Sequence, residues 1–232
     1  PRREGMTAEP VWHPSPNVGD RRGGVAPDMI VLHYTAMKSA EAACERLCDP
    51  AAQVSAHYVV AEDGRAWQLV REEHRAWHAG AGAWGPVRDV NSHSIGIEIA
   101  NTGAAPFPDL QMTVVENLLR GIMARWQITP DRIVGHSDTA PGRKIDPGPR
   151  FDWRRLALQG LSVWPSAADE PGDFLHDARR FGYDVEAAGE DVVLNAFRMR
   201  FRPWAEGPLE DEDRRLMHDL ANRWPVAQAA LA

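Results

Sequence analysis

The segment Met29-Ile-Val-Leu-His-Tyr34 decides the fold class of this chain. Its odd and even positions are both apolar until the end, which is typical of a central β-strand covered on both faces. His33 lies near the carboxyl end of the predicted strand, where the functional sites of α/β sheets usually form. The sequence therefore predicts a buried sheet with a candidate functional histidine at its edge.

Helical and strand patterns alternate after this segment. Apolar residues recur at helical spacing from Val115 to Trp126, and a second helix is expected from Ser39 to Cys48, before Asp49-Pro50. Further strands are expected at residues 55–60, 66–70, 94–100 and 133–134. This alternation predicts an α/β (α+β) fold with a central mixed β-sheet flanked by helices.

The sequence changes in character between Ser162 and Asp173. The run Trp164-Pro-Ser-Ala-Ala-Asp-Glu-Pro-Gly172 is typical of a linker, and strand patterning stops after it. The remaining residues predict three short helices near 174–181, 190–201 and 210–224, with glycines between them. We therefore expect two domains, 1–165 with the sheet and 166–232 as a small C-terminal three-helix domain.

Arginines alternate with aromatic residues in the second of these C-terminal helices. Such a pattern is compatible with a patch that binds nucleic acid or another polymer. The interpretation that we favour is a helix with an apolar face and with its arginines on the solvated side. The residues concerned are Arg198, Arg200 and Arg202, and Phe197, Phe201 and Trp204.

Composition excludes several classes of protein. The chain has 232 residues, of which 33 are acidic and 26 are basic, so its formal net charge is −7. This length allows one or two domains whose core needs no disulfides. No apolar stretch approaches the ~18 residues of a membrane-spanning helix. The acidic balance disfavours a wholly basic, nucleic-acid-binding surface. We expect no membrane span and no nucleic-acid partner, and we favour a monomer.

The cysteines and the N-terminus bear on the compartment. Cys44 and Cys48 lie one helical turn apart, a poor frame for a disulfide, so free thiols are expected. Free thiols are typical of a reducing compartment. Residues 1–10 contain no apolar signal-peptide core. We expect a cytoplasmic protein; the alternative is a periplasmic or envelope-associated protein from which a signal was removed.

A second candidate site residue lies in the strand pattern Ser94-Ile-Gly-Ile-Glu-Ile-Ala-Asn101. The three isoleucines share one face of the predicted strand, and the opposite face is small except for Glu98. That face leaves room for a ligand beside a carboxylate. Taken alone, the strand favours a solvated glutamate on an exposed face of the sheet.

The turn-rich segment Gly135-His-Ser-Asp-Thr-Ala-Pro-Gly-Arg-Lys-Ile-Asp-Pro-Gly148 carries further candidates. Asp146 precedes a proline and is biased to an extended conformation; if Lys144 shares that conformation, the two side chains point the same way. Spacing alone favours a simple ion pair for these two residues and a core position for His136. No two histidines have the spacing of a zinc finger or of a His-Glu-x-x-His helix, so any metal site must combine distant segments.

Taken together, these segments resemble the zinc-dependent N-acetylmuramoyl-L-alanine amidases of the AmpD/AmiD type, whose fold is shared with the peptidoglycan recognition proteins. The C-terminal stretches Phe181-Gly-Tyr-Asp184 and Ala196-Phe-Arg-Met-Arg-Phe-Arg-Pro203 resemble the peptidoglycan-binding-type helical domain of the AmiD branch. The catalytic-part motifs that carry the resemblance are Val31-Leu-His-Tyr-Thr-Ala36, Val54-Ser-Ala-His-Tyr58, Arg75-Ala-Trp-His-Ala-Gly80, Ser94–Asn101, Gly135-His-Ser-Asp138 and Arg143-Lys-Ile-Asp-Pro-Gly-Pro149.

The resemblance implies one Zn²⁺ ion bound by His33, His136 and Asp146, with Glu98 and Lys144 as the catalytic pair. The implied reaction hydrolyses the amide between N-acetylmuramic acid, or its 1,6-anhydro form, and L-alanine. Peptidoglycan fragments or muropeptides are the implied partners, in cell-wall recycling or turnover.

Several aromatic residues are weaker candidates for substrate contacts. Trp77, His78 and Trp84 lie in or beside a glycine-rich segment that could line a groove, although tryptophans commonly pack in the core. His57 and Tyr58 are expected to pack structurally on a strand beside the His33 strand.

Two functions follow from the resemblance. The first is the amidase, and the alternative is a non-catalytic peptidoglycan-binding recognition protein with the same fold. A binding-only relative is free to lose a zinc ligand, and here all five implied metal and catalytic residues are present. The sequence therefore favours the enzyme. The two-domain layout resembles the AmiD branch, whereas the missing signal and the unpaired cysteines favour AmpD-type recycling.

Overall fold

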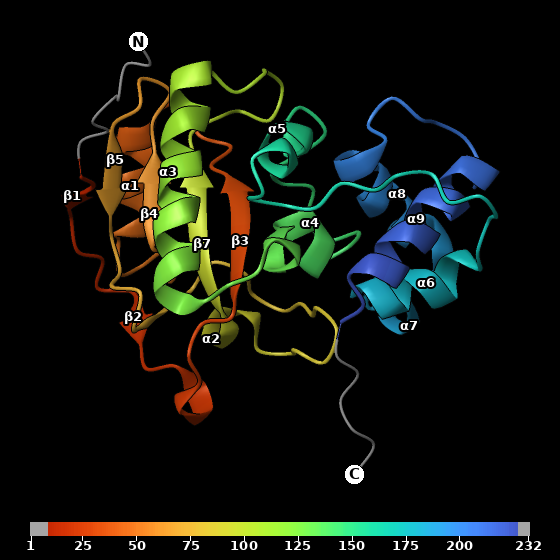
Figure 1. The fold of residues 1–232 in the computed structure, drawn as a ribbon. Coiled ribbons are helices and arrows are strands. Elements are labelled where there is room, and N and C mark those ends of the chain that lie inside the picture. The colour runs from red at the N-terminus through yellow and green to blue at the C-terminus, as the bar shows by residue number, and fades with distance from the viewer. Residues whose placement is uncertain (1–8, 227–232) are drawn as a thin grey trace.

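The computed structural model describes residues 9–226, so most of the N-terminal segment that lacks an apolar core lies outside the described residues. Its main feature is a six-stranded sheet in the order β1-β5-β4-β7-β3-β8 (Figure 1). The β4–β5 pair is antiparallel and the other pairs are parallel, so the predicted mixed sheet is confirmed. The strands are β1 (Val11–Trp12), β3 (Met29–Tyr34), β4 (Tyr58–Val60), β5 (Ala66–Gln68), β7 (Ser94–Ile99) and β8 (Ile133–Gly135); β2 (Val18–Gly19) and β6 (Arg75–Ala76) form a separate antiparallel pair.

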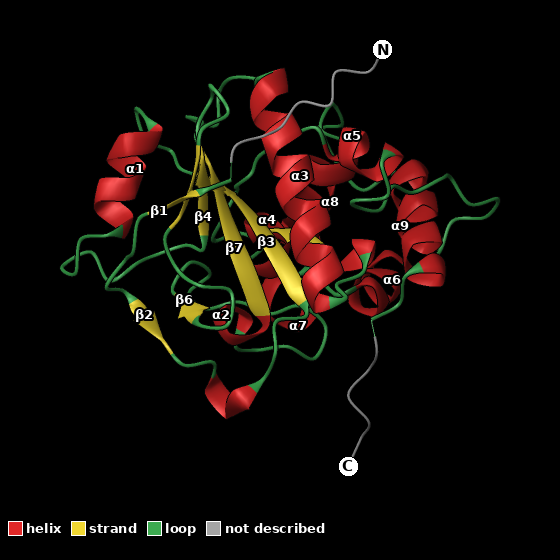
Figure 2. Ribbon diagram, turned by 60° about the vertical axis from the view of Figure 1, so that its left-hand side comes forward, coloured by secondary structure: helices red, strands yellow, loops and turns green. Residues whose placement is uncertain are grey.

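Helices cover both faces of the sheet. Helix α3 packs on one face against the isoleucines of β7 and against Ile30 and Leu32 of β3. Helix α1 covers the other face near β4, and Figure 2 shows the two helices on opposite sides of the sheet. The helices are α1 (Ala40–Leu47), α2 (Val90–His93), α3 (Asp109–Trp126), α4 (His136–Thr139), α5 (Trp153–Leu158), α6 (Phe174–Phe181), α7 (Val185–Ala188), α8 (Glu190–Phe201) and α9 (Asp211–Arg223).

The structure corrects the predictions for two strands. The strands expected at 55–60 and 66–70 are shorter, because only 58–60 and 66–68 pair with neighbours. The 58–60 strand pairs with β7, not with β3, so the expectation that it lies beside the His33 strand is wrong. His57 is buried and accepts a hydrogen bond from the Gly96 amide, and the Tyr58 hydroxyl donates to Glu72. Both side chains pack structurally, as expected.

The C-terminal part contains the three predicted helices, α6, α8 and α9, and the short additional α7. Residues 162–173 form no helix or strand, but Val163 is buried. One hydrophobic cluster runs from Val31 and Val134 of the sheet to Phe197 and Leu220 of the C-terminal helices. These helices therefore share a core with the part of the chain that carries the sheet. No helix within residues 9–226 is both long enough and apolar enough to cross a membrane.

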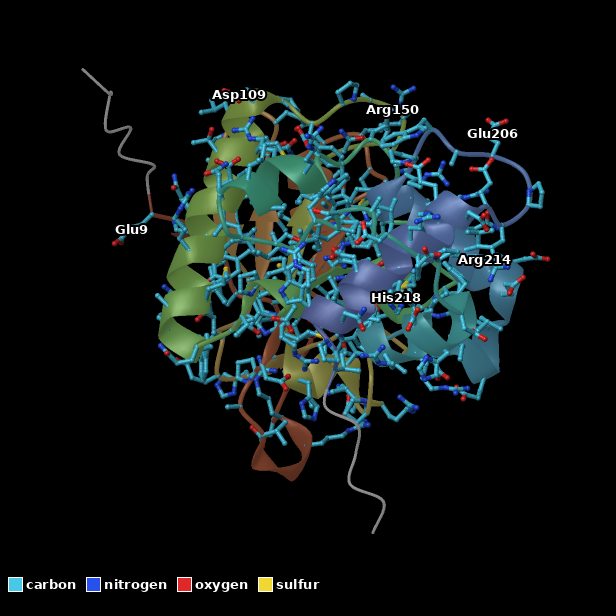
Figure 3. The ribbon with its side chains drawn as sticks, turned by 45° about the vertical axis from the view of Figure 1, so that its right-hand side comes forward. Glu9, Asp109, Arg150, Glu206, Arg214 and His218 are labelled. Carbon is cyan, nitrogen blue, oxygen red and sulfur yellow. The ribbon has the colours of Figure 1, made fainter. Side chains whose placement is uncertain are left out.

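The arginines at the end of α8 and directly after it are buried, so the expectation that they lie on the solvated side is wrong, and they form no surface patch. Arg198, Arg200 and Arg202 are only 5%, 2% and 5% exposed. Arg198 and Arg202 both pair with the buried Asp213 of α9. By contrast, Glu206 and Arg214 lie at the outer edge of these helices (Figure 3). The prediction failed because the guanidinium groups pair with buried carboxylates of other helices, which the local sequence pattern does not reveal.

Arg200 joins the C-terminal helices to the sheet. Its Nη1 lies 2.7 Å from Oδ2 of Asp138 in α4, and its Nη2 donates to the carbonyl of Ile133 at 2.9 Å. The other oxygen of Asp138 accepts a 2.7 Å hydrogen bond from the Tyr183 hydroxyl. Asp138 also accepts from the Gly135 amide at the start of α4. Figure 1 shows α4 between the sheet and the C-terminal helices.

Arg200→Leu should lower the free energy of unfolding by about 3–5 kcal/mol, because it leaves the Asp138 carboxylate buried without its counter-charge. Urea denaturation of the whole chain measures this loss. The matched control is Arg154→Leu, which removes an exposed arginine and should change stability by less than about 0.5 kcal/mol. Equal stability of the Arg200→Leu and Arg154→Leu variants would contradict the assignment.

Glu72 makes a second buried polar cluster, at the end of α3. Its carboxylate accepts hydrogen bonds from Arg125, Trp126 and Tyr58, and it is 6% exposed. Burial alone would raise the pKa of Glu72, but the hydrogen bonds from Arg125, Tyr58 and Trp126 outweigh it and lower the pKa below the ordinary 4.5. The stability that comes from this carboxylate is present above pH 4.5 and is lost as the pH falls through the lowered value.

Glu72→Gln should therefore destabilise the chain by about 1–3 kcal/mol at pH 7, where the wild-type carboxylate is ionised. The difference from wild type should shrink as the pH falls below 4.5. Chemical denaturation at several pH values measures both effects. Glu73→Gln, at the exposed neighbouring position, is the control. A difference that is the same at all pH values would show that ionised Glu72 does not stabilise the fold.

Candidate metal centre and active site

Three side chains from distant segments meet at one edge of the sheet. His33 lies near the carboxyl end of β3, and His136 directly follows the neighbouring parallel strand β8, so the pairing of the strands brings them together. Asp146 comes from the loop after α4. Its Oδ2 lies 2.9 Å from Nδ1 of His33 and 3.1 Å from Nδ1 of His136. All three residues are buried, and they could hold a metal ion.

The chemistry of these three groups fits a cation. Nε2 of His136 lies 2.9 Å from the carbonyl oxygen of Ala79, which can only accept, so Nε2 carries the proton. In a neutral ring, Nδ1 then presents a lone pair to the Asp146 carboxylate. Lone pairs and a carboxylate that converge in a buried place repel each other unless a cation lies between them.

Burial sets the charge state of His33. Burial, and then the neighbouring His136, lower the pKa of His33 to about 4, so the ring is neutral at pH 7. A neutral imidazole and an ionised carboxylate are the forms that bind a metal.

Glu98 lies directly opposite His33 on the neighbouring strand β7. Its Oε2 is buried and has no hydrogen-bond partner within the described part of the chain. Burial, and then the charge of Asp146, raise the pKa of Glu98 to about 8, and Lys144 partly offsets this. The strand therefore presents a carboxyl group that gains and loses a proton near neutral pH.

Lys144 lines the same cavity as Glu98. Within the described residues, Lys144 forms no ion pair with Asp146, whose partners are His33 and His136. The structure therefore does not support a simple ion pair between Lys144 and Asp146. The cavity has a volume of about 490 Å³. Its lining combines the three candidate metal ligands with Glu98 and Lys144, and with Thr35, Arg46, Leu47, Ser55, Trp77, His78 and Arg143 among others.

The structure brings together the five residues that the sequence singled out for metal binding and catalysis. Trp77 and His78 also line the cavity, and their contact with substrate stays a prediction. The expectation that Trp84 lines a substrate groove is wrong. Trp84 is fully buried, and its ring packs against Phe181 and Tyr183 of the C-terminal part.

Two basic residues of the cavity were not predicted. Arg143 donates to the carbonyl oxygens of Ala79 and Ala81, and so holds the glycine-rich loop beside the site. Arg46 reaches the cavity from α1. Arg143 stands next to Lys144 in the sequence, a signal that could have identified it. Arg46 had none, because the sequence does not reveal which part of the sheet α1 covers.

Comparison with known proteins assigns the family. A family model described as N-acetylmuramoyl-L-alanine amidase matches residues 23–149. The chain is 37% identical over 209 residues to the N-acetylmuramoyl-L-alanine amidase AmiD of Escherichia coli strain K12, and the match covers 75% of each chain. It is 34% identical to the 1,6-anhydro-N-acetylmuramyl-L-alanine amidase AmpD of Salmonella typhimurium strain SL1344, over 68% of this chain and 95% of that protein.

Two solved structures share both the sheet and the C-terminal region. The complex of E. coli AmiD with anhydro-N-acetylmuramic acid-L-Ala-D-gamma-Glu-L-Lys superposes with a TM-score of 0.77 at 35% identity, over 87% of this chain and 92% of that one. AmpDh3 from Pseudomonas aeruginosa, in complex with anhydromuramic pentapeptide, gives a TM-score of 0.79 at 31% identity, over 90% and 96% of the two chains. On this evidence, the chain belongs to the N-acetylmuramoyl-L-alanine amidase family of AmiD and AmpD.

Proposed function

We propose that this chain is a zinc amidase that hydrolyses the amide bond between N-acetylmuramic acid, or its 1,6-anhydro form, and L-alanine in muropeptides. The observation that carries the proposal is the convergence of His33, His136 and Asp146 beside Glu98 and Lys144 in one cavity. Family membership supplies the reaction class.

His33, His136 and Asp146 would hold Zn²⁺. Two imidazole nitrogens and one carboxylate oxygen are a typical ligand set of catalytic zinc, which leaves a further position open. When bound, Zn²⁺ supplies a Lewis acid that polarises the scissile carbonyl and lowers the pKa of water. The remaining chemistry belongs to the side chains of the cavity.

Glu98 is the proposed general base and acid. Its unpartnered Oε2 is free to accept the proton of the attacking water, and the same carboxyl then gives this proton to the departing nitrogen of L-alanine. An amide nitrogen is a poor leaving group until it is protonated. A carboxyl whose pKa is raised towards neutrality serves both steps better than an ordinary glutamate.

Lys144 is the proposed electrostatic partner of the reaction. Hydrolysis passes through a tetrahedral intermediate whose carbonyl oxygen becomes negatively charged. A lysine ammonium group in the same cavity stabilises that charge more than it stabilises the neutral amide, which lowers the activation barrier. A binding-only protein has no need of such a pair of Glu98 and Lys144 beside the metal ligands.

The substrate is proposed to be a muropeptide rather than a free amino-acid amide. The solved structures of AmiD and AmpDh3 are complexes with anhydromuropeptides. The cavity here combines an aromatic face, Trp77, with the basic side chains of Arg46 and Arg143. These groups suit a sugar attached to a peptide that bears carboxylates.

Glu98→Gln should keep zinc and lose at least about 10²-fold in the rate of amide hydrolysis, because an amide side chain cannot accept the proton of water. Elemental analysis measures the zinc, and mass spectrometry of released stem peptides measures the rate. Hydrolysis at nearly the wild-type rate would rule out the general-base role.

Asp146→Ala should instead lower zinc occupancy, because it removes one of three protein ligands. The control is Asp152→Ala, an exposed aspartate outside the cavity, which should retain its zinc. Full occupancy in the Asp146→Ala variant would show that Asp146 is not a ligand.

The substrate class is tested by incubating the zinc-loaded chain with 1,6-anhydro-muropeptides and, separately, with intact sacculi. We expect free stem peptides from the anhydro-muropeptides. Release from sacculi as well would indicate the wider range of an envelope enzyme, whereas release from neither substrate would reject the amidase proposal.

A further inference from the structure

One short segment, Trp77–Ala79, contacts both candidate metal-binding histidines on the side away from Asp146. Nδ1 of His78 lies 3.0 Å from Nε2 of His33. The carbonyl oxygen of the next residue, Ala79, lies 2.9 Å from Nε2 of His136. Each histidine therefore faces Asp146 with Nδ1 and this segment with Nε2.

The hydrogen bonds of His78 determine which atom carries the proton. The Ser94 hydroxyl has one hydrogen, and it donates this to the carbonyl oxygen of Val90 at 2.5 Å. Ser94 Oγ must then accept from Nε2 of His78, which lies 3.2 Å away. Nδ1 of a neutral His78 is consequently an acceptor, and Nε2–H of His33 donates a hydrogen bond to it. Nδ1 of His33 is left as a lone pair for a metal ion.

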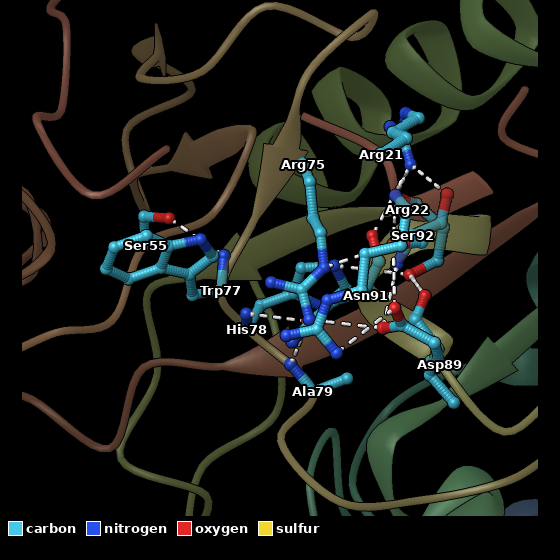
Figure 4. Close-up of polar contacts among 12 residues, drawn as sticks. Arg21, Arg22, Ser55, Arg75, Trp77, His78, Ala79, Asp89, Asn91 and Ser92 are labelled. Carbon is cyan, nitrogen blue, oxygen red and sulfur yellow. Dashed lines mark hydrogen bonds and ion pairs between the residues drawn. The ribbon is translucent and has the colours of Figure 1, made fainter. Parts of the chain in front are cut away.

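The backbone of the same segment is held by Asn91 of α2. Oδ1 of Asn91 accepts from the amides of His78 at 3.0 Å and of Ala79 at 2.8 Å (Figure 4). The buried Arg21 in turn binds the end of α2 and the start of β7, through the carbonyl oxygens of Ser92 at 2.6 Å and Ser94 at 3.1 Å. None of these residues is a candidate metal ligand, yet all of them constrain the segment.

The His78 ring packs closely against the backbone of β7. A Cβ atom placed on Gly96 of β7 would lie 2.5 Å from Cγ of the His78 ring. The ring therefore packs directly on the strand that also carries Glu98. The absence of a side chain at residue 96 is what allows His78 to reach His33.

We propose that His78, supported by Ser94 and Asn91, is a positioning residue that sets the tautomer and orientation of His33 for metal binding. This role rests on the proposed zinc site and explains why a half-buried histidine that is not a ligand lies beside it. Groups that accept the outer N–H of a metal-binding histidine typically contribute ~10–100-fold to metal affinity.

The central test compares two substitutions of His78 by zinc affinity, measured in competition with a chelator. His78→Phe fills the space without an acceptor and should weaken zinc binding by ~10–100-fold. His78→Asn places an amide oxygen near the position of Nδ1 and should restore most of the affinity. His13→Phe, at an exposed histidine, controls for the loss of one imidazole and should bind zinc as wild type does.

The tautomer itself is read in the metal-free chain by ¹⁵N NMR of the histidine side chains. The wild type should show His33 protonated at Nε2 alone, and His78→Phe should show a mixture of tautomers. Gly96→Ala gives an independent variant, because its methyl group displaces the His78 ring without removing any hydrogen-bonding group from the chain. It should weaken zinc binding as His78→Phe does, and thermal unfolding of each metal-free variant checks that it is folded.

Two results would overturn the proposal: unchanged zinc affinity in folded His78→Phe, or an equal loss in His78→Phe and His78→Asn with an unchanged His33 tautomer. Failure of the zinc site itself is distinguishable, because the wild-type chain would then bind no stoichiometric zinc.

Discussion

Two imidazole nitrogens lie within about 3 Å of the same carboxylate oxygen in the interior, and the rest of the site depends on that convergence. Buried groups of this kind are stable together only with a cation or a shared proton. The parallel pairing of β3 with both β7 and β8 creates the arrangement. It places His33 opposite Glu98 and next to the start of α4, where His136 begins the helix.

The elements whose apolar residues follow a regular local pattern could be predicted from the sequence. The apolar run of β3, the alternating β7 and the helical spacing of α3 each specify their own burial, because one local pattern decides which face turns inward. The two-residue strands and the four-residue helices were not predictable, because tertiary hydrogen bonds rather than local patterns hold them. Residues of the site could be found from the motifs, whereas the burial of Trp84 and the arginines of α8 depends on partners far away in sequence.

The C-terminal helices are connected to the metal centre through α4. Asp138, two residues after His136, pairs with Arg200 and accepts from Tyr183, and these partners all come from the C-terminal part. A buried ion pair of this kind has exacting geometry, since either partner alone would be costly. Arg200 of α8 thus contributes to the position of the segment that carries His136, in addition to any contact that these helices make with peptidoglycan. Trp84 makes a second connection to the C-terminal helices, because its ring, in the loop after the His78 segment, packs on Phe181.

The central claim is that zinc binds through two histidines and one aspartate at the edge of the sheet. X-ray absorption at the zinc edge of the loaded, full-length chain tests it most directly, because it counts the ligand atoms around the metal. We expect imidazole nitrogen and carboxylate oxygen ligands at about 2.0–2.2 Å from the zinc ion and no sulfur ligand. A zinc–sulfur distance of about 2.3 Å would place the metal at Cys44 and Cys48 and would contradict the account.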